Sequence, residues 1–113
     1  MKRTQLRRQS PQKALWNSRY ARAKAKRMLE HPGCEVCEFT RRLIRPAQDG
    51  HHPFGQGGKR IMVFVVACRV CHDVIHGNPN AARTAGWLYR RGDNLIQPVR
   101  DAIERAGMSD ILP

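Results

Sequence analysis

The sequence predicts a small α+β domain with structural zinc at its centre, flanked by an N-terminal basic helix and by C-terminal helices. The chain has 113 residues, enough for one domain with a modest hydrophobic core. Two Cys-x2-Cys pairs border a run of β-branched residues, and helical patterns stand on both sides of this region. We therefore divide the chain into a basic arm and helix (1–30), a zinc-stabilised core (31–80) and a helical scaffold (81–113).

The first of these parts is the most basic. It holds ten Lys and Arg and a single acid, and so accounts for most of the net charge of +12. Ser10 is a suitable N-cap for Pro11 at the first helical position, and Gly33 closes the segment. The pattern therefore predicts a helix over 11–30, preceded by a loose basic arm over 1–9.

Most side chains of this helix are expected to face solvent or phosphate. Trp16 and Tyr20, four residues apart, form one narrow stripe that can pack. The remaining surface is mostly basic, and a later Gly-rich turn adds two more cations. The side chains predicted to contact nucleic acid are Arg19, Arg22, Lys24, Lys26, Arg27, Lys59 and Arg60. The alternative is a solvated basic face without a partner.

The overall charge narrows the class of partner. A pI near 10.8 favours a polyanion, nucleic acid first, over a neutral sugar. The longest apolar run, Ile61–Cys68, is far shorter than the roughly 20 residues that span a bilayer. No apolar signal-peptide core follows the basic N-terminus. We therefore expect no membrane partner and a cytoplasmic location.

The central part combines turns, a strand and a short helix. A tight Cys-x2-Cys turn and a polar stretch lead to two adjacent histidines, and a Gly-rich turn follows. The β-branched run then predicts a strand over Ile61–Val66. After the second cysteine pair, the spacing predicts a short helix over Cys71–Gly77. His72 and His76 would share one face of that helix.

The C-terminal part is expected to be scaffold. Asn78-Pro79 predicts a helix start with Ala81–Trp87 as its body, and Gln97-Pro98 predicts a second helix that ends at Gly107. The packing stripe of this second helix is Val99, Ala102, Ile103 and Ala106.

The four cysteines are predicted to hold structural zinc. In a reducing compartment, cysteines at this spacing are metal ligands rather than disulfides. Zinc takes four soft or borderline ligands in a tetrahedron, and two Cys-x2-Cys turns supply all four. The ligands are Cys34, Cys37, Cys68 and Cys71. The alternative is a set of unligated buried thiols or disulfides, which packing alone rarely places at this doubled spacing.

Four of the five histidines point to a second metal site, whereas His31 is expected in a loop. Histidines at i and i+4 on a helix can both face one divalent ion, as His72 and His76 would. If the strand folds back from the Gly-rich turn, the pair His51-His52 faces that helix. The alternative for each histidine is a local hydrogen bond without a metal.

The order of these motifs resembles the HNH endonucleases of the four-cysteine, zinc-stabilised type, especially the small HNH proteins of bacteriophages. The resemblance covers about residues 34–80, including the Ile-His-x-x-Pro continuation at 75–79. It implies a ββα-metal core that clasps one catalytic divalent ion, which would be Mg²⁺, Mn²⁺, Ni²⁺ or Zn²⁺. It also implies that His52 is the general base, and that His51, His72 and His76 are ligands of the catalytic ion.

One position departs from the family pattern. The middle Asn of the motif falls at Val63, and no Asn occurs between Pro53 and Gly77, although Gln56 is a candidate substitute. Two functions therefore stay open: a metal-dependent DNA endonuclease that nicks or cuts with weak specificity, and a zinc-stabilised nucleic-acid-binding protein that has lost cleavage. A structural or partner-inhibiting protein whose basic face meets an acidic protein is a third.

The resemblance also indicates partners and a setting. DNA is the expected substrate, and RNA and branched DNA stay open because charge and a phosphodiesterase site do not read the sugar. Analogy with phage proteins adds packaging or recombination proteins as partners and the cytoplasm of a bacterial host as the location.

Overall fold

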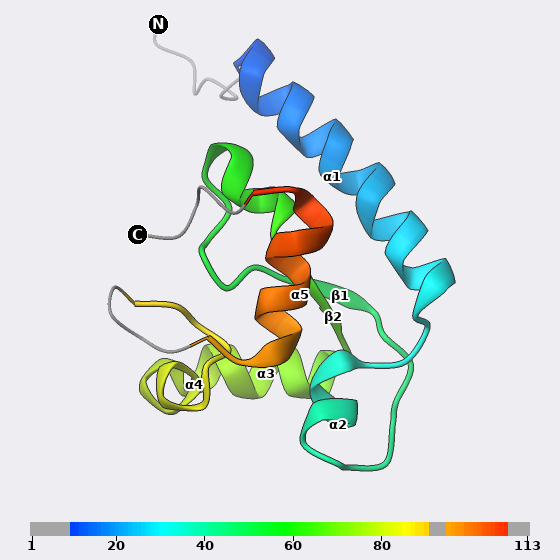
Figure 1. Ribbon diagram of the computed structural model, residues 1–113, viewed down its shortest axis with the longest axis vertical. Helices are drawn as coiled ribbons and strands as arrows, with labels where there is room; N and C mark the ends of the chain where they lie inside the picture. Colours follow the sequence, from blue (N-terminus) through cyan, green and yellow to red (C-terminus); the bar gives the residue numbers. More distant parts are fainter. Residues whose placement is uncertain (1–9, 91–94, 109–113) are drawn as a thin grey trace, which may run out of the picture.

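The computed structural model describes residues 10–90 and 95–108. They form a small α+β protein in which helices surround a two-stranded antiparallel sheet (Figure 1). The elements in chain order are α1 (Pro11–Glu30), α2 (Glu35–Phe39), β1 (Asp49–His51), η1 (Gly58–Met62, a 3-10 helix), β2 (Val65–Ala67), α3 (Arg69–Gly77), α4 (Pro79–Ala85) and α5 (Gln97–Ala106). The arm expected over 1–9 lies outside the described residues, as do 91–94 and 109–113 of the expected scaffold.

The helix expected over 11–30 is confirmed as α1. The Ser10 hydroxyl accepts a hydrogen bond from the Lys13 amide at 3.1 Å, and Pro11 occupies the first turn, where no amide donor is needed. The helix lies along one side of the molecule, against η1 (Figure 1). A Cβ at Gly50 would lie 1.9 Å from the Tyr20 hydroxyl, so only glycine lets α1 approach β1 this closely.

The sheet is a short hairpin that leads straight into α3. Asp49 pairs with Ala67 and His51 pairs with Val65 in antiparallel register. All three residues of β2 are buried, because α2, α5 and α1 contact this strand. The hairpin thus brings His51, the last residue of β1, beside the helix α3 that begins after Cys68.

The strand predicted over Ile61–Val66 is wrong over its first four residues, Ile61–Phe64. Residues Gly58–Met62 form η1 instead, and β2 begins only at Val65. Ile61 is buried in the 3-10 turn, so it satisfies the apolar pattern without being in a strand. A short apolar run marks burial, and the three-residue partner β1 limits how much of the run can pair.

The remaining helices build the scaffold as expected, except that α4 ends at Ala85, where Gly86 takes a left-handed conformation, so Trp87 lies outside the helix predicted to contain it. In α5, Val99, Ala102 and Ile103 are buried, and Ala106 packs partly buried against the same core. Trp87 is buried as well and stands in T-shaped contact with Phe39, with ring centroids 5.6 Å apart. Across the described part of the chain, every helix is too short or too polar to cross a membrane.

Candidate metal centre and histidine cluster

The four cysteines meet in the core although two segments supply them. Cys34, Cys37, Cys68 and Cys71 are buried, unpaired by disulfides, and have sulfur atoms within 4.8 Å of one another. The Cys37 sulfur lies 3.9 Å from that of Cys68 and 3.6 Å from that of Cys71. Thiolates bound to one tetrahedral zinc at about 2.3 Å lie about 3.8 Å apart. The cluster therefore fits a metal such as zinc.

Each cysteine pair is built into a helix start. The Cys34 sulfur accepts the Cys37 amide at 3.3 Å, and the Cys68 sulfur accepts the Cys71 amide at 3.4 Å. Burial raises the pKa of the Cys34 and Cys71 thiols. Burial also raises the pKa of Cys68, but hydrogen bonds from the Cys71 backbone and the other thiols outweigh it and lower that pKa to about 7. One sulfur of the cluster is thus readily available as a thiolate.

Three histidines form a second cluster. One nitrogen from each of His51, His72 and His76 lies within 4.8 Å of the others, and the Nε2 atoms of His72 and His76 are 2.9 Å apart. Two nitrogens bound at about 2.0–2.1 Å to one ion lie about 3 Å apart in neighbouring positions. The ring centroid of His51 lies 5.7 Å from that of His72 and 5.9 Å from that of His76. The separations fit a shared cation.

The tautomer of His51 adds a second fit. Its Nε2 lies within hydrogen-bonding distance of the Trp87 carbonyl, which can only accept, so Nε2 carries the proton. The opposite nitrogen, Nδ1, is then a lone pair that is buried and has no partner. Burial of the ring, together with the neighbouring histidines, lowers the pKa of His51 to about 4 and keeps it neutral. A neutral imidazole with an unpartnered lone pair is the form that binds a metal.

His52 lies beside this cluster rather than in it. The residue is 8% exposed, and its ring packs edge-on against Tyr20, with centroids 4.7 Å apart, and near Phe64. Burial lowers its pKa to about 4, against a hydrogen bond from the ring to the Ile61 backbone. Tyr20 keeps its hydroxyl proton, because burial and the nearby Asp49 carboxylate raise its pKa to about 12. His52 is therefore a neutral ring held between α1 and the hairpin.

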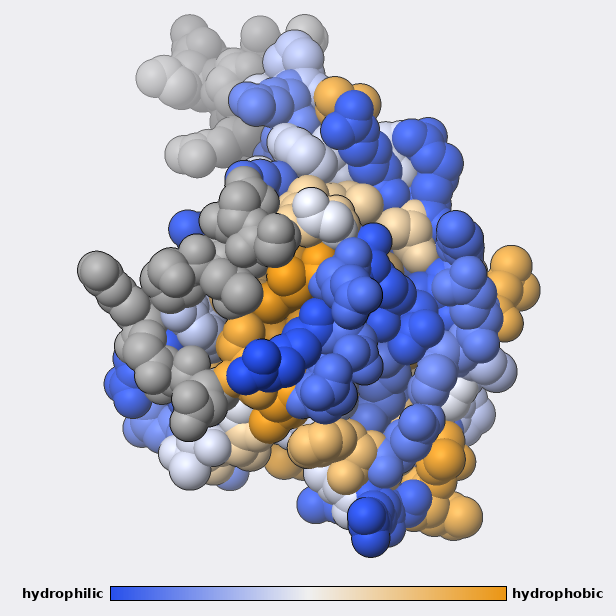
Figure 2. Space-filling model, in the orientation of Figure 1, coloured by the Kyte–Doolittle hydropathy of each residue, from blue (hydrophilic) through white to orange (hydrophobic). Residues whose placement is uncertain are grey.

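The expected nucleic-acid contacts do not all stand on one open surface. Arg19, Arg22, Lys26, Lys59 and Arg60 are exposed, whereas Lys24 and Arg27 are half-buried. The face of α1 in Figure 2 is mostly hydrophilic. The guanidinium of Arg27 binds the buried carboxylate of Glu35 at 2.6 Å, so this side chain holds the interior together.

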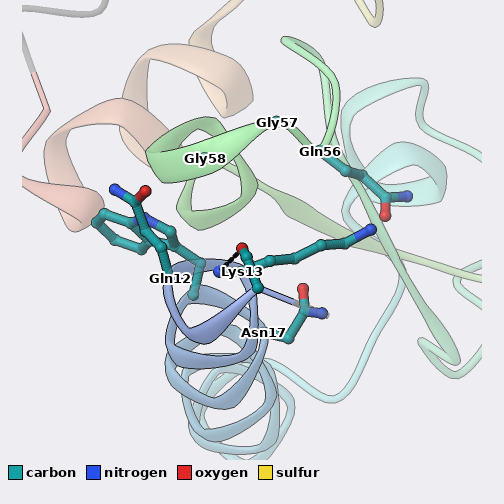
Figure 3. A pocket seen from close by; sticks show the side chains of 8 residues that line it. Gln12, Lys13, Asn17, Gln56, Gly57 and Gly58 are labelled. Carbon is teal, nitrogen blue, oxygen red and sulfur yellow. Dashed lines mark hydrogen bonds between the residues drawn. The ribbon is translucent and has the colours of Figure 1, made fainter. Parts of the chain in front are cut away.

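A polar cleft lies between the start of α1 and the Gly-rich turn. Its volume is about 750 Å³. Lys13 extends across it toward Gln56, and the amides of Gln12 and Asn17 also line it, while Gly57 and Gly58 expose backbone (Figure 3). The turn that forms one wall is continuous with the histidine pair in sequence, which ends four residues before Gln56.

Sequence reasoning missed the groups that orient the histidines. The Trp87 carbonyl lies beyond the residues that carry the motif, and nothing in its sequence surroundings marks it. Asp49 accepts a hydrogen bond from His72 Nδ1 at 3.2 Å and pairs with Arg69. The available signal was an acid two residues before the histidine pair.

The fold and these clusters define a small α+β protein whose four buried cysteines could hold a metal such as zinc. Comparison with known proteins gives no matching family model, and no curated protein or solved structure that matches the chain.

Proposed function

We propose that the protein is a metal-dependent HNH endonuclease with a ββα-metal core, which hydrolyses DNA phosphodiester bonds by nicking or with weak specificity. The observation that carries the proposal is the convergence of His51, His72 and His76 beside His52. These side chains come from β1, the residue after it, and α3, the hairpin and helix that such a core requires. The proposed structural zinc in the cysteine cluster would hold the hairpin against α3.

The histidine cluster has the right donors for a catalytic ion. Imidazole nitrogens suit Zn²⁺ and Ni²⁺, and three protein ligands leave positions open for substrate and water. When bound there, a divalent ion supplies Lewis-acid stabilisation of the charge that develops on the phosphodiester oxygens. His51, His72 and His76 would hold the ion, and Mg²⁺, Mn²⁺, Ni²⁺ and Zn²⁺ are the candidates.

His52 is the proposed general base. A neutral imidazole can accept a proton from the water molecule whose oxygen attacks phosphorus, while the bond from phosphorus to the 3′ oxygen breaks. His52 follows His51 directly and interacts electrostatically with His72, so a substrate held at the ion would lie near it. Its packing against Tyr20 and Phe64 limits the orientations of the ring. This packing would hold the loop that carries His52, which is the role that the middle Asn has in the HNH family.

The charge supports DNA as the substrate. The exposed cations of α1 and η1 are placed to neutralise backbone phosphates, an interaction that does not depend on sequence. The polar cleft beside Gln56 gives a strand a route past the loop that carries the histidines. RNA and branched DNA remain candidate substrates, and packaging or recombination proteins of a phage remain candidate partners.

A second function has specific support. His52 is 8% exposed, and Val63, at the position of the family's Asn, is fully buried in the apolar core. A buried base without its polar brace favours a zinc-stabilised nucleic-acid-binding protein of HNH fold that has lost cleavage.

The test is nicking of supercoiled plasmid with Mg²⁺, Mn²⁺ or Ni²⁺, against reactions to which EDTA is added. We expect weak, metal-dependent nicking, and a loss of about 10²–10⁴-fold in His52→Ala, the usual contribution of a general base. DNA affinity should stay unchanged in that variant.

His31→Ala is the matched control, because it removes the same ring from a site outside the cluster. It should nick like the wild type. Binding without nicking under any ion would replace the nuclease with the binding protein. Nicking that survives His52→Ala would reject His52 as the base.

A further inference from the structure

We propose that Asp49 is a positioning residue that fixes His72 in the tautomer able to bind the catalytic ion. The inference rests on the proposed function to the extent that His72 is there a ligand. It assigns a role to a side chain that touches neither the ion nor the substrate.

A hydrogen bond joins the side chains of Asp49 and His72. The Oδ2 atom of Asp49 lies 3.2 Å from Nδ1 of His72. A carboxylate can only accept, so Nδ1 carries the proton and Nε2 keeps its lone pair. That Nε2 is the atom 2.9 Å from Nε2 of His76. The bond therefore aims the free lone pair of His72 at the centre of the histidine cluster.

Asp49 is held in place by Arg69 and by the hairpin. Arg69 reaches both of its oxygens, with Nε 2.9 Å from Oδ2 and Nη2 3.2 Å from Oδ1. This two-point geometry fixes the plane of the carboxylate as well as its position. The backbone of Asp49 is fixed too, because it pairs with Ala67 across the hairpin. Asp49 is thus an anchored acceptor.

Within the cluster, His51 and His72 are oriented by different kinds of partner. His51 gains the same kind of orientation from the Trp87 carbonyl, a backbone group that substitution does not remove. Partners of this kind fix both ring direction and tautomer, and their loss typically costs about 10–100-fold in metal affinity. For His72 the partner is a side chain, so its contribution can be measured.

The experiment uses the full chain with zinc in the cysteine cluster. Ni²⁺ is titrated into wild type, Asp49→Ala and Asp49→Asn by calorimetry, and imidazole nitrogen NMR reports the tautomer of His72 before Ni²⁺ is added. We expect Asp49→Ala to bind Ni²⁺ about 10–100-fold more weakly and to lose the single Nδ1-protonated form. Asp49→Asn retains an amide oxygen that can accept the bond, and it should recover part of both.

Asp73→Ala is the matched control: it removes an exposed carboxylate from the residue next to His72 in α3. It should bind Ni²⁺ like the wild type and keep the His72 tautomer. Equal affinity and an unchanged tautomer in Asp49→Ala would overturn the inference and leave the nuclease proposal standing. Weakened Ni²⁺ binding in a protein that does not nick DNA would support the inference and overturn the nuclease. A wild type whose histidine cluster binds none of Mg²⁺, Mn²⁺, Ni²⁺ and Zn²⁺ would overturn both.

Discussion

Glu35 is the residue on which the interior polar contacts converge. Its carboxylate accepts from the Arg27 guanidinium at 2.6 Å and from the Val66 amide at 2.7 Å, and Arg105 stands 3.9 Å away. The side chain is almost completely buried, so these donors replace the water it has lost. Through it α1, β2 and α5 are joined at one point, which explains why Arg27 is not an open phosphate contact.

Glu35→Ala should lower the free energy of unfolding by about 3–5 kcal/mol, because it leaves the Arg27 charge buried without its partner. Urea denaturation of the zinc-loaded protein measures the change. Glu38→Ala is the control, since that carboxylate is exposed and pairs with His31 at the surface. Its cost should stay within about 0.5 kcal/mol. An equal loss of unfolding free energy in the two variants would contradict the prediction that the buried pair of Arg27 and Glu35 stabilises the fold.

The sequence predicts ligands better than it predicts what orients them. The residues of both clusters could be chosen because Cys-x2-Cys and His-x3-His spacings place side chains together within one turn or helix. The Trp87 carbonyl and Asp49 meet their histidines only through tertiary folding, 36 and 23 residues away in sequence. No local pattern encodes such contacts.

Among the elements, the helices that begin at cysteines are the most informative. Cys34 precedes α2 and Cys68 precedes α3, and each sulfur caps its own helix. An ion shared by both pairs would therefore hold two helix starts and the strand between them. Because the sheet is small, such an ion would contribute much of the stability.

Cys37→Ser should abolish zinc binding and leave the chain largely unfolded. Structural zinc in finger peptides binds with roughly 10–16 kcal/mol of apparent free energy, and one missing ligand forfeits much of it. Elemental analysis and circular dichroism measure the two effects. As a control, wild type stripped of metal should refold when Zn²⁺ is returned, and Cys37→Ser should not. A folded wild type without zinc, or a stable Cys37→Ser, would contradict the prediction.

Element boundaries could be predicted where the backbone chemistry is explicit. The Ser10-Pro11 pair correctly predicts the first residue of α1. Gly107, at a φ of 65°, ends α5 as expected. The 3-10 turn of η1 could not be distinguished from a strand, because burial of Ile61 looks the same in both. The short α2 was expected only as a turn, since five residues carry too little periodicity.

For the whole molecule, the net charge of +12 is unevenly distributed. The helix α1 runs along one side of the body (Figure 1), and its side chains Arg19, Arg22 and Lys26 are exposed. A polyanion would therefore approach from this side, which also leads to the polar cleft (Figure 3).

Replacing Arg22 and Lys26 with Gln should weaken DNA binding for all sequences alike. The slope of log K against log salt should become shallower by about 0.9 for each phosphate that the variant no longer neutralises. The control variant replaces Arg83 in α4 and Arg100 in α5 with Gln, which removes the same amount of charge elsewhere. It should leave the salt dependence of DNA binding unchanged. Fluorescence anisotropy at several salt concentrations measures it. An unchanged slope in the α1 variant would mean that this helix faces another kind of partner.

The adjacency of Cys71 and His72 in α3 has a thermodynamic consequence. These consecutive residues belong to different clusters, so the rotation of one helix about its axis sets the direction of both side chains. Occupancy of the cysteines would restrict that rotation and so lower the entropy that the histidines lose on taking an ion. Linkage makes the effect reciprocal: each ion would raise the affinity for the other by the same factor.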